Sequence, residues 1–96
     1  MEIIYHPEAR NELLQAASFY ENNREGLGRD FLSAAQIGTN FINIYPEAGR
    51  IIKKPYRRLL IKRFPYGIIY RQTKNCIYIV AVMHLKRRPG YWIERI

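Results

Sequence analysis

The C-terminal part of the sequence brings together a histidine, several cations and two aromatic residues. They are His84, Lys86, Arg87, Arg88, Tyr91 and Trp92. Imidazole titrates near neutral pH, lysine and arginine stabilise phosphate charge, and aromatic rings stack on bases. These groups suit the cleavage of RNA by its own 2′-hydroxyl, which needs an acid, a base and cations but no metal ion. For such a reaction we predict His84, Arg87 and Tyr91 as catalytic residues.

Further cations lie earlier in the same half of the chain. The residues that we predict to bind RNA or another partner are Arg57, Arg58, Lys62, Arg63, Arg71, Lys86, Arg88 and Trp92. Each candidate also has a structural interpretation. A histidine at a strand end often bonds the backbone, exposed cations are often only solvated, and Trp92 can anchor the C-terminal segment. The sequence leaves both interpretations open.

The cations are segregated along the chain. Residues 1–48 hold three basic and seven acidic residues, a net charge of 3 − 7 = −4. Residues 49–96 hold thirteen basic residues against Glu94 alone, a net charge of 13 − 1 = +12. Charge that serves only solubility would not segregate in this way. The asymmetry therefore predicts a partner that is a polyanion or an acidic protein.

The composition is that of one small globular domain, residues 1–96. Because 48% of the residues are hydrophobic, the chain can form a core and is not a disordered protein. No apolar run approaches the roughly 20 residues of a membrane-spanning helix, and the first residues do not resemble a secretory signal. The single cysteine, Cys76, excludes an intrachain disulfide. We therefore expect a cytoplasmic protein with no membrane contact.

Several kinds of site are missing from the sequence. It contains no glycine-rich phosphate loop and no cysteine pair, and its two histidines, His6 and His84, are far apart. The only aspartate, Asp30, falls in a predicted helix, which argues against a Ser-His-Asp triad. We expect no cofactor and no metal ion.

The hydrophobic pattern changes from a helical to a strand period near residue 49. Apolar residues spaced three and four apart predict two helices in the first half, and the short connection between them predicts an antiparallel helical hairpin. A strand precedes the helices, and alternation predicts three more strands after them. The predicted order is strand 2–6, helix 7–23, helix 27–45, and strands 57–63, 66–71 and 76–83. Residues 85–96 are predicted as a short helix or an extended tail.

This order, β-α-α-β-β-β, predicts an α+β fold in which an antiparallel sheet packs on the helical hairpin. The hairpin covers one face of such a sheet. Arg58, Lys62 and neighbouring cations would then occupy the other face, which we expect to be the functional surface.

Several stretches of the sequence, taken together and in this order, resemble a known family. They are Tyr5–Ala9, Glu12–Leu13, Phe19–Tyr20, Gly26–Gly28, Phe31–Leu32, Arg63–Tyr66, Ile69–Arg71, Ala81–Val82 and His84–Arg87. The family is the RelE/ParE superfamily of toxins from bacterial type II toxin–antitoxin systems. The resemblance implies the α+β fold predicted above. It also implies a small cytoplasmic toxin that inhibits growth, takes part in plasmid stabilisation and is held inactive by a cognate antitoxin protein.

The superfamily has two kinds of target. RelE-like members are ribosome-dependent endoribonucleases that cut mRNA, and ParE-like members poison DNA gyrase without cutting RNA. Gly67 stands where RelE-like enzymes tend to carry an arginine, and Leu60 stands where a further cation would help. The turn Phe64–Tyr66 and the spacing of His84 and Arg87 are more similar to ParE. The sequence therefore favours a ParE-like toxin, with an mRNA endoribonuclease and a non-toxic nucleic-acid-binding module as the alternatives.

The antitoxin is expected on two surfaces. Antitoxins of this kind are commonly acidic or amphipathic where they bind the toxin, and they would meet the half of the chain with a net charge of +12. We predict contacts with the basic sheet face and with the groove beside the helical hairpin.

Overall fold

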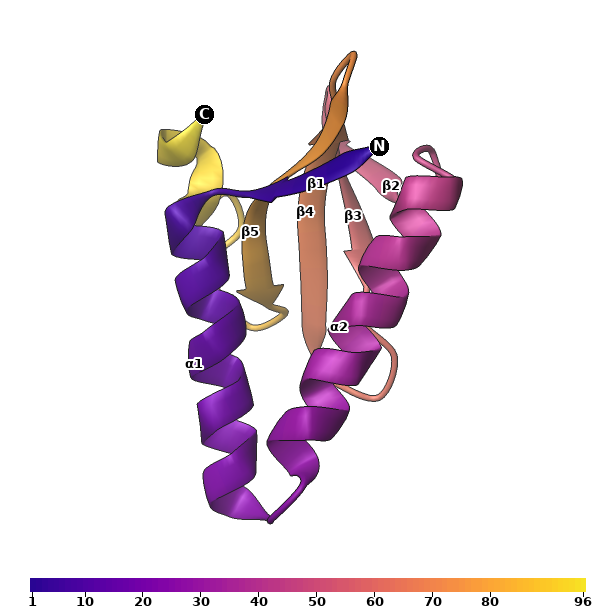
Figure 1. The fold of residues 1–96 in the computed structure, drawn as a ribbon. Coiled ribbons are helices and arrows are strands. Elements are labelled where there is room, and N and C mark those ends of the chain that lie inside the picture. The colour runs from indigo at the N-terminus through magenta and orange to yellow at the C-terminus, as the bar shows by residue number, and fades with distance from the viewer.

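A computed structural model describes all residues, 1–96, as two helices packed on one side of a five-stranded sheet (Figure 1). The elements are β1 (Glu2–Tyr5), α1 (Pro7–Asn23), α2 (Leu27–Ile44), β2 (Arg50–Lys53), β3 (Tyr56–Leu60), β4 (Tyr66–Gln72), β5 (Cys76–His84) and the 3₁₀-helix η1 (Tyr91–Arg95). Neither helix has the length and apolar content needed to cross a membrane.

The strand order is β1-β5-β4-β3-β2, and the α+β class with its helical hairpin is as the sequence predicts. Three details differ from the prediction. The strand predicted over 57–63 ends at Leu60, so Lys62 and Arg63 follow it rather than lying on the sheet. A further strand, β2, pairs with β3 at one edge of the sheet. At the other edge β1 runs parallel to β5, so the sheet is mixed rather than fully antiparallel. The helical connection between β1 and the later strands allows this parallel pairing.

Local signals explain where the helices begin and end. Pro7 occupies the first turn of α1, and the Nδ1 atom of His6 accepts a hydrogen bond from the Glu8 N–H at 3.0 Å. The connection to α2 turns at Gly26, whose φ of 86° favours glycine. The Glu21 carboxylate accepts hydrogen bonds from the N–H groups of Gly26 and Gly28, both at 3.0 Å, and thereby ties the two helices together.

The two faces of the sheet carry different cores. The helix side holds the larger cluster, in which alanines of α1 and residues such as Phe31 and Ile42 of α2 pack on β4 and β5. The opposite face holds a smaller cluster around Tyr56, Ile69 and Trp92, which η1 partly covers. This face is therefore only partly covered, and Arg50 of β2 and Arg58 of β3, which pair with each other, both lie on it.

Candidate functional site

A row of cations lies on the sheet face away from the helices, which we call the basic face and define by Arg50, Lys53, Arg58 and Arg71. Register places Arg50 opposite Arg58 and Lys53 opposite Tyr56, and directly paired residues share one face. The ion pairs of the structure are Arg63–Asp30, Arg87–Glu12 and Arg95–Glu12. None of them involves the basic face, so its charge is free for a partner.

Gly67 determines how Arg58 lies on the basic face. Leu60 pairs with Gly67 across β3 and β4, and Arg58 lies two residues before Leu60 on the same side. A β-carbon on Gly67 would come within 2.9 Å of both the Cγ and the Cδ atoms of Arg58. The aliphatic part of Arg58 therefore crosses the sheet over the glycine. Gly67 stands at a position where RelE-like enzymes tend to carry an arginine. Here the glycine leaves space for the side chain of Arg58 from the neighbouring strand.

Arg71 is a cation of the basic face that is enclosed by aromatic residues. It is half-buried, pairs with Tyr78 across β4 and β5, and places its guanidinium 5.8 Å from the centre of the Tyr56 ring. Its Nε atom is buried and makes no hydrogen bond. An arginine held in this way by aromatic neighbours retains donors for an anionic partner.

Three predicted partner-binding cations on β3 or directly after it lie away from the basic face. Arg57 is on the helix side, where its Nη1 atom donates to the carbonyl oxygens of Glu47 at 3.2 Å and Gly49 at 2.9 Å and so fixes the loop before β2. Lys62 and Arg63 follow β3 and line a groove beside α2. Arg63 lies 3.7 Å from Asp30 in an exposed ion pair.

The groove runs between α2 and β3 and has a volume of about 540 Å³. Its floor and walls are mainly apolar, and Asp30, Lys62 and Arg63 lie at its polar end. The other lining residues are Ser33, Ala34, Ile37, Gly38, Phe41, Leu59 and Leu60. Ile37 and Leu60 are 66% and 54% exposed, and with Phe41 they form a contiguous apolar surface along the groove.

His84 is placed on the helix side of the sheet. It pairs with Tyr66 across β4 and β5, and the two rings meet edge to face at 5.0 Å between centroids. Its Nδ1 atom accepts a hydrogen bond from the Lys86 N–H at 3.0 Å, so His84 caps the turn that follows β5. Its ring thus lies on the opposite side of the sheet from Arg58 and Arg71.

Arg87 and Tyr91 contact each other, and both also contact the carboxylate of Glu12. The Arg87 guanidinium stacks 3.9 Å from the centre of the Tyr91 ring, and its Nη1 atom lies 3.4 Å from Glu12. The Tyr91 hydroxyl donates a 2.6 Å hydrogen bond to the same carboxylate. Burial, this hydrogen bond and the negative charge of Glu12 all raise the pKa of Tyr91. Tyr91 therefore stays protonated near neutral pH.

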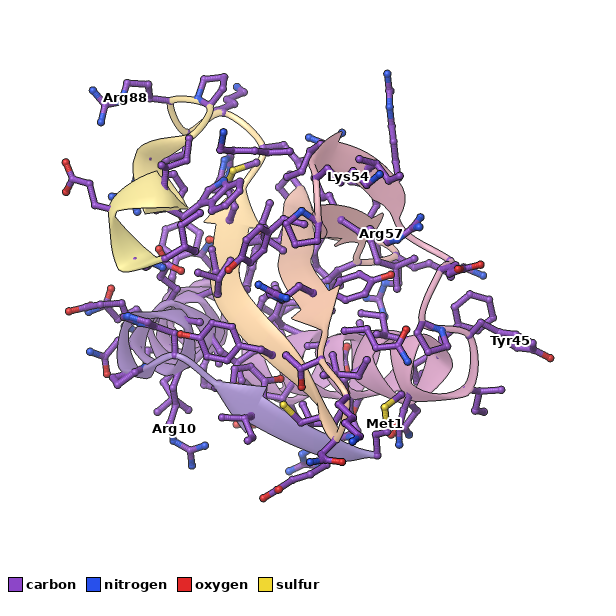
Figure 2. All side chains as sticks on the ribbon, turned by 90° about the horizontal axis from the view of Figure 1, so that it is seen from above. Met1, Arg10, Tyr45, Lys54, Arg57 and Arg88 are labelled. Atoms are coloured by element: carbon purple, nitrogen blue, oxygen red, sulfur yellow. The ribbon has the colours of Figure 1, made fainter.

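The remaining predicted residues of the C-terminal stretch divide into two groups. Lys86 and Arg88 are exposed in the turn between β5 and η1, and Figure 2 shows Arg88 on the side of the sheet away from Arg10 of α1. Trp92 is only 2% exposed and packs on Tyr56, with 5.3 Å between ring centroids. Its ring is not available to stack on a base in this structure, and it anchors η1 to the sheet.

Sequence reasoning missed Glu12 and Arg95, which organise this end of the molecule. Glu12 lies on α1 and Arg95 on η1, and the two form a bidentate ion pair with both N–O distances at 2.9 Å. Burial would raise the pKa of Glu12, but hydrogen bonds from Arg95, Tyr91 and the Val82 N–H outweigh it and lower the pKa. For Glu12, the sequence gives only its place in the stretch Glu12–Leu13, which is part of the family resemblance. For Arg95, the available signal is that Glu94 and Arg95 interrupt an otherwise apolar end of the chain.

The comparisons with known proteins agree with this fold. Residues 3–89 match the family described as the ParE toxin of the type II toxin–antitoxin system parDE. Among solved structures, a chain of the chromosomal ParDE toxin–antitoxin system from P. aeruginosa is similar, with 18% sequence identity and a TM-score of 0.66. The similarity covers 90% of this chain and 97% of that one, and at this identity it shows the shared fold. No curated protein sequence matches the chain.

The family match spans nearly all of the domain, from β1 through the turn after β5. It includes the helical hairpin, the groove and the basic face. The chain therefore belongs to the ParE toxin family of type II toxin–antitoxin systems.

Proposed function

We propose that this protein inhibits growth by binding DNA gyrase and that a cognate antitoxin neutralises it. The observation that carries the proposal is the separation of the groups that RNA cleavage would need. The His84 ring packs on Tyr66 on the helix side, whereas Arg58 and Arg71 lie on the basic face. A surface of cations without an adjacent acid or base can bind a partner but supplies no proton transfer.

The state of Tyr91 supports the same proposal. A tyrosine that serves as an acid or a base must exchange a proton near the working pH. The Tyr91 hydroxyl instead donates a hydrogen bond to Glu12, and the pKa of Tyr91 is raised, so the hydroxyl keeps its proton. Arg87 shares that carboxylate, so part of its charge is already balanced within the chain. Both residues therefore have structural roles in this account.

For the antitoxin, we propose the groove between α2 and β3 as its principal docking site. The groove has a volume of about 540 Å³ and an apolar floor, and Lys62 and Arg63 lie at one end of it. An amphipathic helix would bury its apolar face there and place carboxylates against the two cations. Acidic residues beyond that helix would then reach the basic face, which has no internal counter-charge.

The test of the proposed function is a reconstituted translation reaction in which mRNA 5′ ends are mapped by primer extension. We expect the purified protein to leave the mRNA intact, with and without ribosomes. The sharpest contrary result is a set of new cuts that need the ribosome and disappear in His84→Ala. That result would replace the gyrase proposal with the endoribonuclease alternative.

A second arm tests neutralisation in cells. Expression of the chain alone should arrest growth, and co-expression of the neighbouring gene should relieve the arrest. Growth that continues during expression of the chain alone would contradict the proposal of a toxin. It would favour a non-toxic basic module instead.

A further inference from the structure

The edge of β5 is open where β1 ends. β1 pairs only with Cys76–Ile79, and the His6 N–H makes the last contact, at 2.8 Å to the Ile79 carbonyl. Beyond that point, the Val80 carbonyl and the Val82 N–H have no neighbouring strand on this side. Arg95 donates to the Val80 carbonyl at 3.0 Å, and Glu12 accepts from the Val82 N–H at 3.0 Å. Two side chains thus take the place of a strand.

The same two side chains are bonded to each other. The Glu12 carboxylate accepts a hydrogen bond from each terminal nitrogen of Arg95, one on Oε1 and one on Oε2. Its Oε2 atom also accepts a hydrogen bond of 2.6 Å from the Tyr91 hydroxyl. The side chains of Glu12 and Arg95 are 12% and 14% exposed, so water contributes little to either charge. The carboxylate is saturated with donors, three of which come from the end of the chain.

The turn between β5 and η1 carries Lys86, Arg87 and Arg88, and we call it the basic turn. At its start, the Leu85 N–H bonds the Pro65 carbonyl at 2.8 Å and the His84 side chain caps the Lys86 N–H. Beyond this start, the turn is held by the 3.4 Å contact of its own Arg87 with Glu12 and through η1, which Glu12 bonds and whose Trp92 packs on Tyr56. Glu12 is therefore the polar contact that closes the turn.

We infer that Glu12 is a positioning residue that locks η1 onto the β5 edge and thereby fixes the basic turn beside the basic face. The physical reason is the burial of Arg95. A buried cation that loses its partner is strongly unfavourable, and η1 can relieve this by moving Arg95 into water. The larger core lies on the helix side and contains no residue of η1. Loss of the ion pair between Glu12 and Arg95, which we call the lock, should therefore release η1 by a local opening while the rest of the domain stays folded.

Trp92 gives a direct readout because it is the only tryptophan of the chain and it lies on the locked segment. We expect Glu12→Gln to raise the acrylamide quenching constant of its fluorescence several-fold and to shift its emission to longer wavelength. Circular dichroism should show that the helices remain. The matched control is Glu25→Gln, which removes a carboxylate from the exposed turn before α2 and should leave Trp92 protected.

A double variant distinguishes release driven by the unpaired charge of Arg95 from release caused only by the loss of its hydrogen bonds to Glu12. Replacing both charges, as in Glu12→Gln with Arg95→Met, removes the unpaired cation that drives release. We expect Trp92 to be better protected in the double variant than in Glu12→Gln alone. Arg95→Met alone supplies a second route to release if Glu12→Gln does not fold. Trp92 that stays protected in both folded single variants, or loss of all helical signal in both, would overturn the inference.

The effect on activity rests on the proposed function and is measured separately. If the basic turn contributes to gyrase binding, Glu12→Gln should weaken inhibition of gyrase in proportion to the exposure of Trp92. If η1 is released and inhibition does not change, Glu12 still fixes η1 as inferred, but the position of η1 has no role in gyrase inhibition. A wild-type protein that does not inhibit gyrase would contradict the proposed function but not the lock.

Discussion

Arg58 lies across Gly67 on the neighbouring strand, close enough that a β-carbon at residue 67 would stand 2.9 Å from its Cγ and Cδ atoms. The contact explains how a residue of β3 extends its charge over β4. It also gives Gly67 a role that its identity alone does not suggest. The glycine is buried within a strand, where this residue type is normally unfavourable.

Gly67→Ala should therefore act through Arg58. The added methyl group displaces the Arg58 side chain, so we expect gyrase inhibition to fall about as much as in Arg58→Ala. Stability should change little, because alanine is preferred over glycine in a strand by roughly 0.5–1 kcal/mol and offsets part of the crowding. In the Arg58→Ala background, Gly67→Ala should have no further effect on inhibition. Additive losses in the double variant would show that Gly67 acts independently of Arg58.

Tyr70 is predicted to contribute strongly to stability. It is fully buried, its hydroxyl donates to the Pro46 carbonyl at 2.8 Å, and it accepts from the Gly49 N–H at 2.9 Å. Tyr70→Phe leaves both backbone groups unpaired, at a cost of about 1–3 kcal/mol. Thermal unfolding should show a Tm lower by roughly 4–8 °C for each kcal/mol lost. The control Tyr45→Phe alters an exposed ring and should leave Tm within experimental error; equal effects would contradict the role of the buried hydroxyl.

The acid limb of the stability curve should depend on Glu12. Its pKa is lowered in the folded state, so its contribution is present above the unfolded pKa of about 4.3 and is lost as pH falls through the folded value. Urea titrations across this range should show a smaller decline in unfolding free energy for Glu12→Gln than for the wild type. Part of the decline will remain, because the pKa of Glu21 is lowered as well. Parallel curves for the two proteins would contradict the assignment.

Antitoxin binding should depend on the groove beside α2. Ile37→Glu places a charge on the apolar wall, and because Ile37 is exposed the fold should tolerate it. We expect weaker binding to the product of the neighbouring gene and loss of growth rescue on co-expression. Leu14→Glu is the matched control, since Leu14 is an exposed leucine of α1 outside the groove. Equal loss in both variants would argue against the groove as the docking site.

Much of the fold could be predicted because it follows from local signals. The spacing of Ala9, Ala16, Ala17 and Tyr20 predicts α1, and Pro7 marks its start. β2 was not predicted, because its residues Arg50–Lys53 are all exposed and show no alternation. The strand is defined by pairing with β3 rather than by its own pattern. The parallel placement of β1 beside β5 likewise depends on residues far apart in sequence.

The candidate site was predictable in composition but not in arrangement. The net charge of the second half indicates a basic surface, and Arg58 and Arg71 do lie on one. Which side of the sheet His84 occupies depends on the register of β4 with β5, where it pairs with Tyr66. The contact between Glu12 and Arg95 joins positions 83 residues apart, and no local pattern reports such a pair.

The most direct test of the central claim is a supercoiling assay with purified DNA gyrase. We predict that the wild-type protein inhibits supercoiling and that Arg50→Ala with Arg58→Ala weakens inhibition by about tenfold or more, less so at high salt where such charges are screened. Arg10→Ala with Arg24→Ala removes two exposed cations of the helix side and should inhibit like the wild type. Full gyrase activity at saturating wild-type protein would contradict the account.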